Sequence, residues 1–390
     1  MPWTETCGMD ERKRFVNDWL SGRFKKTELC AAYRVSRPTG DKWIERTIAK
    51  GMQAVAEHSR APHRHPNATA PELVEMIIQT KLAHLSFGPK KVLDRLRDEY
   101  PRCRWPADST AGEILKRAGL VRPRRMRRRV HPDSTAFAAC QRCNQLWSVD
   151  FKGDFALRNR QRCYPLTLSD NFSRYLLACQ GLAHPTTEAV QPWMEWAFRE
   201  YGLPDCIRSD NGPPFASLAV GGISTLSKWW IRLGIRPQRI RPGKPGQNGR
   251  HERMHRSLKA AAVYPLAPNF TAQQCRFNHF RHEYNFERSH EALNRTTPGK
   301  VYRASLRPYP AKLPAVEYGN DVLVRYVRPN GEIRWAGELI YLSHVLAKDH
   351  VALKQIGETK WQIRYSFHLL GLLDERTKTI EPVQHWHRDA

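Results

Sequence analysis

Three acidic residues stand in local settings that suit the cutting and joining of phosphodiester bonds. Asp150 lies within an apolar run, WSVDF, that is typical of a β-strand, where a carboxylate is costly unless a cation neutralises it. Asp210 ends a second apolar strand, before Asn211-Gly212 turns the chain. Glu252 lies one turn into a helix that follows a stiff, basic loop, RPGKPGQNG. We therefore expect these three carboxylates to hold divalent metal ions.

The residues around this triad suit a nucleic-acid substrate. Two metal ions about 3.5–4 Å apart can activate an attacking oxygen and stabilise a leaving one while carboxylates hold the metals. Arg256 and Lys259 follow Glu252 at helical spacing, so one carboxylate and two cations project from one face. Lys244 in the preceding loop adds another cation. We expect Lys244, Arg256 and Lys259 to contact DNA.

Each acidic residue alone also has a simpler interpretation. Among 38 Asp+Glu residues, an Asp at a strand end is more often a cap or turn residue, and Glu252 could be a solvated residue paired with Arg256. Two residues compete for places in the triad: Asp154, on the strand face of Asp150, and Asp170, in a second Ser-Asp-Asn. Asp170 falls between two strands, where a hairpin turn explains it. The joint pattern of three acids favours the catalytic interpretation.

Strands and helices alternate around the triad and predict an α/β domain with a mixed sheet. The expected strands are 146–151, 164–168, 175–182, 206–209 and 235–240, and the expected helices are 188–201, 226–233 and one from Asn248. Sheets of this class place ligands at strand ends, which is where Asp210 stands.

The N-terminal region is expected to be helical. An N-cap serine and a first-turn proline predict a helix over 37–50, with Trp43, Ile44 and Ile48 turned inward. In helix-turn-helix geometry this helix would enter a major groove; the alternative is an ordinary helical hairpin with a solvated polar face. The residues available to bases or phosphates are Arg37, Thr39, Lys42 and Arg46.

A second group of helices and a basic linker follow. Helices are expected from Pro71, over 89–100 and up to Ala118, which together could form a second helix-turn-helix unit. Residues 122–129 hold six arginines in eight positions, too like-charged to pack, so they form either a solvated tether or a segment lying along phosphates. The arginines expected to contact DNA are Arg122, Arg124, Arg125, Arg127, Arg128 and Arg129.

The last part of the chain predicts a small β-barrel. Apolar alternation over 322–327 and 333–335 flanks Asn330-Gly331, a pattern typical of a hairpin. Further strands are expected over 350–354 and 361–365. Their basic and aromatic residues suit either DNA or another subunit.

Charge and composition favour a polyanionic partner. The chain of 390 residues has 64 Lys+Arg against 38 Asp+Glu, a net charge of +26, which indicates nucleic acid rather than a membrane. No apolar run reaches ~18 residues, and the first residues lack a signal-peptide layout, so we expect a soluble, intracellular protein. Nine scattered cysteines suggest reduced thiols, and Cys140-x-x-Cys143 lacks the second ligand pair that a zinc site needs.

Three segments resemble the acidic motifs of bacterial insertion-sequence transposases that share the retroviral integrase (DDE) catalytic core. They are WSVDFKGDF, IRSDNGPPF and RPGKPGQNGRHERMHRSLK, in that family's order. The separation between Asp210 and Glu252 is similar too, slightly long because residues near Gly221-Gly222 extend the loop. RSHEALNRTTPGKVY resembles the end of the family's catalytic domain.

The resemblance implies a ribonuclease H-like fold, Mg²⁺ or Mn²⁺, and a homo-oligomer assembled on DNA in the bacterial cytoplasm, at the nucleoid. It makes Asp150, Asp210 and Glu252 the metal-binding triad. The expected reaction is hydrolysis at a terminal inverted repeat, followed by attack of the freed 3′-hydroxyl on target DNA. The N-terminus lacks the paired His/Cys zinc motif of retroviral integrases, which removes zinc from the comparison.

Together these patterns predict a multidomain chain. The expected parts are a helix-turn-helix DNA-binding domain over 1–60, a second helical domain over 61–120, a basic linker over 121–143, a ribonuclease H-like core over 144–305 and a β-barrel over 315–380. Two other functions stay open: a DNA-binding regulator with an inert core, and a ribonuclease H-like nuclease without strand transfer. The intact triad argues against an inert core.

Overall fold

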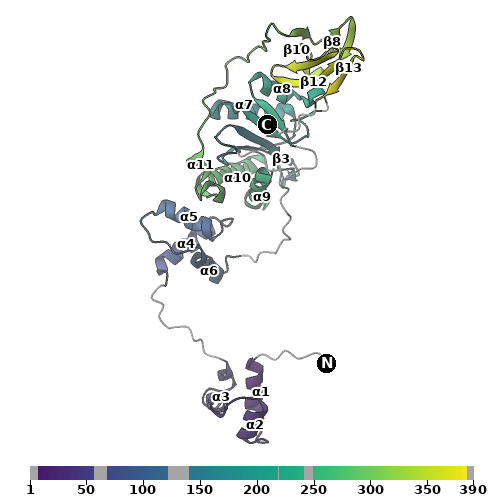
Figure 1. The fold of residues 1–390 in the computed structure, drawn as a ribbon. Helices are drawn as coiled ribbons and strands as arrows, with labels where there is room; N and C mark the ends of the chain where they lie inside the picture. The colour runs from purple at the N-terminus through teal and green to yellow at the C-terminus, as the bar shows by residue number, and fades with distance from the viewer. Residues whose placement is uncertain (1–7, 57–67, 122–139, 218, 241–248, 384–390) are drawn as a thin grey trace. The chain divides into compact units, whose positions relative to one another are not determined.

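The computed structural model describes residues 8–56, 68–121, 140–217, 219–240 and 249–383 (Figure 1). They fall into two compact units, Met1–Ala68 and Thr69–Ala390. The arginines of the expected basic linker and Lys244 lie outside the described residues. None of the described helices combines the length and the apolar character that crossing a membrane requires.

The first unit is a small helical bundle. It consists of α1 (Gly8–Leu20), α2 (Lys26–Ala32), α3 (Arg37–Lys50) and the 3-10 turn η1 (Met52–Val55). Trp43 and Ile44 are buried as predicted, but Ile48 is 67% exposed, so its predicted inward position is wrong. Thr47, one residue earlier on α3, is buried instead, and the fully buried Val55 of η1 completes the core. Ile48 therefore faces solvent.

The second unit begins with three helices that share a core of their own. They are α4 (Pro71–Ala83), α5 (Pro89–Glu99) and α6 (Asp108–Arg117), which confirms the second group of predicted helices. Ile77, Leu93 and Leu115 are completely buried among them. Figure 1 shows these three helices next to one another on the chain before the sheet domain.

The central sheet is mixed, as predicted. Its strands are β1 (Leu146–Phe151), β2 (Phe155–Ala156), β3 (Arg162–Asp170), β4 (Leu176–Leu182), β5 (Cys206–Ser209) and β6 (Arg236–Arg239). β3 pairs antiparallel with β1 on one side and with β2 and β4 on the other, and β1, β5 and β6 run parallel. The meander of β1, β3 and β4 is therefore continued by parallel strands that helices connect.

Helices cover both faces of this sheet. On one face, α7 (Thr187–Tyr201) and α8 (Thr225–Arg232) pack with Trp147, Val149 and Leu166 in the largest core of the chain. On the other, α9 (Gly249–Leu258) and α10 (Phe270–His282) pack over Cys163 and Cys179. Alternate residues along β1 therefore point to different helical layers.

The C-terminal strands form an open sheet and a separate ribbon. They are β7 (Leu323–Tyr326), β8 (Glu332–Trp335), β9 (Glu338–Tyr341), β10 (His350–Gln355), β11 (Lys360–Tyr365), β12 (His368–Asp374) and β13 (Thr379–Pro382). The order β13-β12-β11-β10-β7 runs antiparallel, and β8 pairs with β9. Among the described residues no pairing joins β13 to β7, so the predicted small β-barrel is not confirmed.

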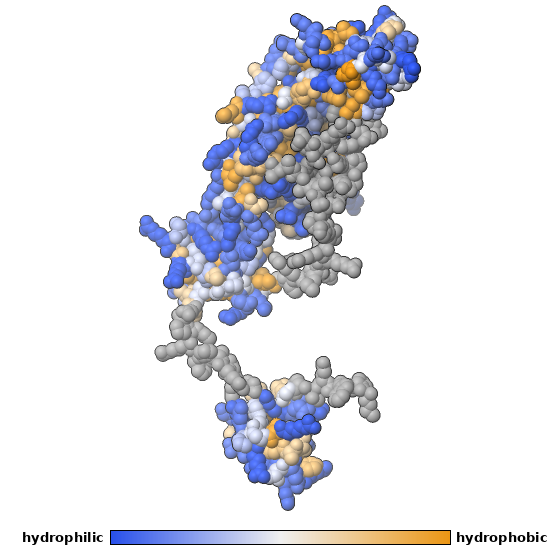
Figure 2. Space-filling view, in the orientation of Figure 1, coloured by the Kyte–Doolittle hydropathy of each residue, from blue (hydrophilic) through white to orange (hydrophobic). Residues whose placement is uncertain are grey.

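The predicted hairpin across Asn330-Gly331 is confirmed as a turn but not as a pair of strands. The chain does turn there, since Arg328 N donates to Glu332 O at 2.8 Å, but β7 pairs with β10 and β8 pairs with β9. The paired strands β8 and β9 are joined by a second turn, Ala336-Gly337, where both residues have positive φ, as a two-residue turn between twisted strands requires. Exposed apolar side chains, including Leu323, Leu339 and Phe367, lie on this C-terminal part, where Figure 2 shows hydrophobic patches.

The C-terminal sheet packs on the extra residues that lengthen the interval between Asp210 and Glu252. Gly221 has a φ of 67°, and a Cβ there would lie 2.9 Å from Leu370 Cα. His368 reaches Gly221 O at 3.3 Å, and Lys228 pairs with Asp349 at 2.7 Å. The long loop is therefore a contact surface for β12.

Candidate active site

Asp150 and Asp210 lie at the carboxyl ends of adjacent parallel strands. In the pairing of β1 with β5, Leu146 lies opposite Cys206 and Ser148 opposite Arg208, an offset of 60 residues. Two residues beyond the last of these pairs, the same offset places Asp150 beside Asp210. Both side chains are half-buried. Burial raises the pKa of Asp210, whose carboxylate also accepts a hydrogen bond from Gly212 N at 3.3 Å.

On its other side, Asp150 lies opposite Thr167 of β3, so both side chains point to the face that α9 covers. The Thr167 hydroxyl is fully buried and donates to Asp150 O at 3.0 Å. It also lies 2.7 Å from Nε2 of both His251 and His255. A hydroxyl has one proton, so each imidazole donates its Nε2–H to this oxygen. The hydroxyl group therefore joins α9, β3 and β1.

The two histidines are neutral at pH 7. Burial lowers the pKa of His251 to about 3, and burial together with nearby His251 and Lys152 lowers the pKa of His255 to about 2. Ser169 lies 3.0 Å from His251 Nδ1, which can accept its hydroxyl proton because Nε2 carries the ring proton. Both rings therefore serve as uncharged hydrogen-bonding groups between helix and sheet.

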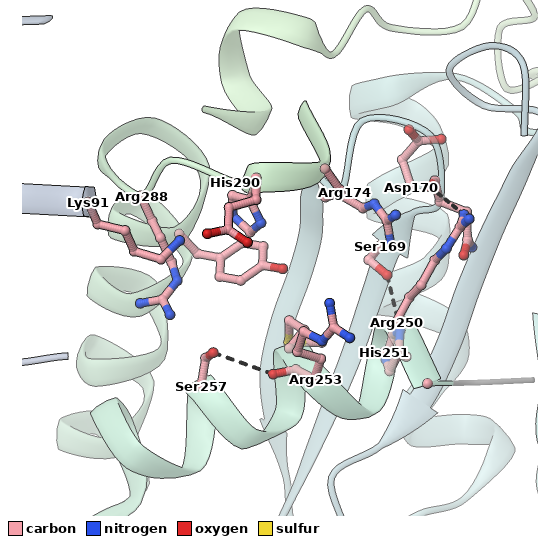
Figure 3. Close-up of a pocket in the computed structure, with 16 residues that line it drawn as sticks. Lys91, Ser169, Asp170, Arg174, Arg250, His251, Arg253, Ser257, Arg288 and His290 are labelled. Atoms are coloured by element: carbon pink, nitrogen blue, oxygen red, sulfur yellow. Dashed lines mark hydrogen bonds between the residues drawn. The ribbon is translucent and has the colours of Figure 1, made fainter. Parts of the chain in front are cut away.

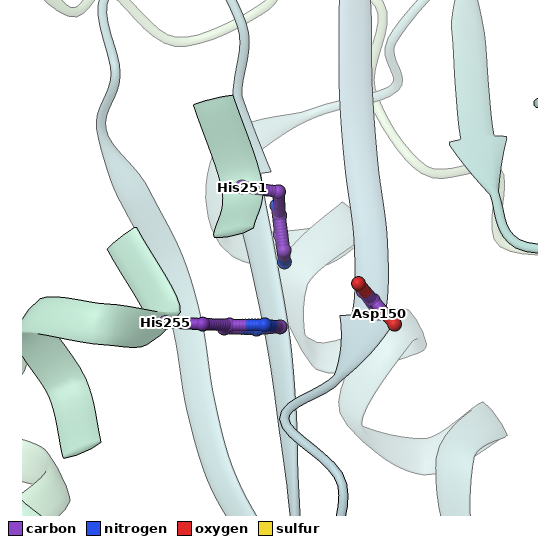
Figure 4. Close-up of side chains that lie close together, drawn as sticks. All are labelled: Asp150, His251 and His255. Carbon is purple, nitrogen blue, oxygen red and sulfur yellow. The ribbon is translucent and has the colours of Figure 1, made fainter. Parts of the chain in front are cut away.

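Asp150, His251 and His255 bring their potential ligand atoms within 4.8 Å of one another (Figure 4). In the part of the chain that the structure describes, this is the one such group of three His, Cys, Asp or Glu residues. Figure 4 shows both imidazoles projecting from α9 toward the strand of Asp150. A carboxylate and neutral imidazoles are compatible with a divalent cation. Both Nε2 atoms are, however, already engaged with Thr167.

Glu252 and Arg256 lie on an exposed face of α9, as their spacing predicts. Lys259 is exposed too, at the first residue of the π-helical turn η4 (Lys259–Val263). Within the described ranges the Glu252 carboxylate has no hydrogen-bond or ion-pair partner, so the alternative pairing with Arg256 is not observed. The structure brings Asp150 and Asp210 to neighbouring strand ends, whereas Glu252 is outside the Asp150 group.

The two competing aspartates have structural partners. Asp154 lies in an exposed loop and pairs with Arg162. Asp170 is buried, and its carboxylate accepts hydrogen bonds from Asn144 N at 2.8 Å and from the amide and hydroxyl of Ser173 at 2.8 and 2.6 Å. Burial raises the pKa of Asp170. Its carboxylate holds the β3–β4 turn, as the predicted hairpin-turn role requires.

The expected DNA contacts of the first unit lie on α3. Arg37 and Lys42 are exposed, and the Thr39 hydroxyl lies 2.9 Å from that of Ser36. The cations of Lys42 and Arg46 lie over the Trp43 ring, at 4.7 and 5.1 Å from its centroid. Arg37 and Lys42 thus remain accessible, while Arg46 is partly covered.

Three site residues were missed from the sequence: Thr167, His251 and His255. A signal for two of them is present, because His251 and His255 stand four residues apart around Glu252 in HERMH and must share a helix face. Thr167 carried no such signal, since its contact with His255 joins residues 88 positions apart.

Comparison with known proteins links both the helical N-terminus and the α/β core to families. Residues 141–245 and 233–298 match two models of an integrase core domain, and residues 11–82 match the leucine-zipper of insertion element IS481. The matches end before the C-terminal sheet.

Two relatives are insertion element proteins. A 39.2 kDa protein of IS476 from Xanthomonas euvesicatoria is 28% identical over 295 residues, which cover 74% of this chain and 80% of that protein. A 31.7 kDa protein of IS407 from Burkholderia multivorans is 29% identical over 189 residues, 48% of this chain and 66% of that protein. A solved structure of the HTLV-2 integrase catalytic core domain in complex with magnesium is 15% identical, covers 42% of this chain and 99% of its own, and has a TM-score of 0.31.

Proposed function

The chain belongs to the bacterial insertion-sequence transposases with a retroviral-integrase-type (DDE) catalytic core, and on that basis we propose that it cleaves DNA at the terminal inverted repeats of its element and joins the freed 3′-hydroxyl to target DNA. The observation that carries the proposal is the pair of carboxylates, Asp150 and Asp210, at the ends of neighbouring parallel strands. That edge is where α/β sheets bind ligands.

The donor set fits a hard divalent cation. Asp150, Asp210 and Glu252 offer carboxylate oxygens, which Mg²⁺ and Mn²⁺ prefer, and the imidazole Nε2 atoms nearest to Asp150 are bound to Thr167. We assign the three carboxylates to the metal and the two histidines to holding α9. A divalent ion bound there would supply the positive charge that stabilises the attacking and leaving oxygens.

The chain's own residues position the substrate. Arg256 on α9 and Lys259 on η4 follow Glu252 along the chain, and they would hold phosphates next to the scissile bond. Arg37, Thr39, Lys42 and Arg46 on α3 would read or grip the terminal repeat, and Lys244 and the linker arginines between Arg122 and Arg129 would add phosphate contacts. The net charge of +26 supports the proposal that these residues contact DNA phosphates.

We also propose a homo-oligomer assembled on DNA in the bacterial cytoplasm, at the nucleoid. Two DNA ends must be held by one assembly for concerted joining, and exposed apolar side chains such as Leu339 and Phe367 offer a subunit contact. Incubation with labelled end DNA, a target plasmid and Mg²⁺ tests the function. Joined product supports a transposase, cut product without joining supports a nuclease, and binding without either supports a regulator.

A further inference from the structure

A basic cleft of about 610 Å³ lies beside α9, outside the carboxylate site. Its walls come from α5, the β3–β4 turn, α9, and the segment that follows α10. Figure 3 shows Lys91 and Arg288 on one side of the cleft and Arg174 and Arg250 on the other. The basic residues that line it are Lys91, Arg174, Arg250, Arg253, Arg288 and His290.

Acidic side chains lie near two of these cations: Asp94 and Glu291 oppose the lowering of the Lys91 pKa, and Glu283 opposes that of the Arg288 pKa. Of the acids that line the cleft, Asp170 is occupied by Asn144 and Ser173, and Glu291 pairs with Lys90 at 3.3 Å. Within the described parts of the chain, no carboxylate forms an ion pair with any of the five Lys and Arg residues in the cleft.

Several of the cations bond neutral groups instead. Arg250 donates to Asn171 O at 3.3 Å and Arg288 to the Ser86 hydroxyl at 3.1 Å, while Lys91 donates to Ser289 O. These bonds fix the cations in place without cancelling their charge. The cleft is therefore built with an excess of positive charge.

The cations are close enough to oppose one another's charge. Burial, followed by Arg288, lowers the pKa of Lys91 to about 8. Burial, followed by Arg250 and Arg253, lowers the pKa of Arg174. Concentrated, partly desolvated positive charge of this kind is unfavourable alone and is stabilised by an anion with several negative groups.

The cleft adjoins the catalytic face through α9. Successive helical residues are about 100° apart, so Arg250 points nearly opposite to Glu252, while Arg253 lies between the directions of Arg250 and Arg256. One helix thus presents basic residues to the cleft and a carboxylate to the reaction. A strand whose reacting phosphate lies at Glu252 can pass around α9 and continue into the cleft.

We propose that this cleft binds the phosphodiester backbone of the element's duplex end, and that Lys91 makes the α4–α6 trio part of the binding site. The inference rests on the proposed function for the identity of the DNA. Phosphate oxygens satisfy several cations at once, as the crowded side chains require, and the open walls accept a continuous chain of phosphates.

The test is the salt dependence of DNA binding by the full-length protein. Fluorescence anisotropy with a labelled end duplex, without divalent metal, gives the affinity across a salt series. Arg174→Gln and Arg253→Gln should each weaken binding and reduce the slope of log K against log salt by about 1, as loss of one phosphate contact requires. Arg199→Gln is the matched control, because Arg199 lies on α7 over the other face of the sheet and should leave the slope unchanged.

Outcomes separate the cleft from the proposed function. If both cleft variants show the same slope of log K against log salt as Arg199→Gln, the DNA-binding role of the cleft would be overturned, whatever the joining assay shows. The same measurement with a duplex RNA tests the assignment to DNA. If the cleft substitutions weaken the binding of duplex RNA as much as that of duplex DNA, or more, the assignment to DNA would be overturned. A reduced slope in a protein that never joins DNA would support the cleft and contradict the transposase. Because the Arg253 side chain is exposed, its variant is expected to fold, and thermal melting checks this.

Discussion

Thr167 on β3 and His255 on α9 are joined by a hydrogen bond of 2.7 Å between Oγ1 and Nε2, on the sheet face of Asp150. The same hydroxyl bonds His251 Nε2 and the carbonyl of Asp150, so one buried group fixes the helix that carries Glu252 against the strand that carries Asp150. Thr167 is therefore a positioning residue for two members of the proposed triad.

Replacing Thr167 with valine should reduce strand transfer while leaving end binding largely intact. The change keeps the shape but leaves two buried imidazole N–H groups without a partner, at a cost of about 1–3 kcal/mol in unfolding free energy. Denaturant unfolding and the joining assay measure the two effects. Thr167→Ser keeps the hydroxyl and should restore most activity; a valine variant with normal stability and normal joining would remove the positioning role.

Arg295 ties the α4–α6 trio to the core. Its guanidinium pairs with Asp94 at 2.6 Å and with Asp108 at 2.8 Å, and the hydrogen bond from Arg295 is the main reason that the pKa of Asp108 is lowered. Arg295→Met should lower the unfolding free energy by about 1 kcal/mol, since its side chain is more than a third exposed and solvent screens both pairs.

Lys300→Met is the control for Arg295→Met. It breaks a pair with Asp98 in which both side chains are about half exposed, and should cost less. Urea midpoints compare the two variants. Equal losses would mean that the Arg295 pairs have no special part in docking the trio.

DNA binding should weaken as pH rises through about 8, because Lys91 loses its proton there. Burial is the main reason that the pKa of Lys91 is lowered, the nearby Arg288 lowers it further, and Asp94 and Glu291 oppose the shift. Its folded pKa lies below that of an unfolded lysine, so between the two values the unfolded chain binds more protons and the residue's contribution to stability rises with pH. Affinity and stability should therefore move in opposite directions.

Anisotropy titrations from pH 7 to 9 measure this effect. Lys91→Met should bind DNA more weakly at pH 7 and show a flatter pH dependence than the wild type. A variant whose affinity falls with pH as steeply as the wild type would exclude Lys91 as the titrating group.

Deleting residues 1–56 should remove sequence preference more than total affinity. The deleted part contains α3 with Arg37 and Lys42, whereas the cleft cations and Arg256 remain. Footprints on end DNA and on scrambled DNA of the same length test this. An unchanged preference would place recognition of the repeat elsewhere in the chain.

Local patterns predicted the central sheet well. Apolar runs between turn residues gave β1 and β5 their observed bounds, and the acids at their ends were correctly placed. Local patterns predicted the turn at Asn330-Gly331 but not the strand pairing, because β7 pairs with β10 and Ala336-Gly337 joins the paired strands β8 and β9. Tertiary pairing, not turn propensity, decided that region.

Contacts between distant residues were beyond the sequence. The bonds of Thr167 depend on how α9 is rotated on the sheet, and the cleft needs Lys91 and Arg288, almost two hundred residues apart, to meet. The HERMH spacing indicates that two histidines share a face but does not say which strand they touch. Single-sequence patterns do not contain this information.

Asp150, Asp210 and Glu252 are the residues proposed to catalyse strand transfer. The direct measurement is Mg²⁺-dependent joining of a labelled end duplex by Asp150→Asn, Asp210→Asn and Glu252→Gln, each compared with its own end-binding affinity. Each variant is expected to bind the end nearly as well as the wild type but to yield no joined product. Near-normal joining by any one of them would contradict that residue's place in the triad.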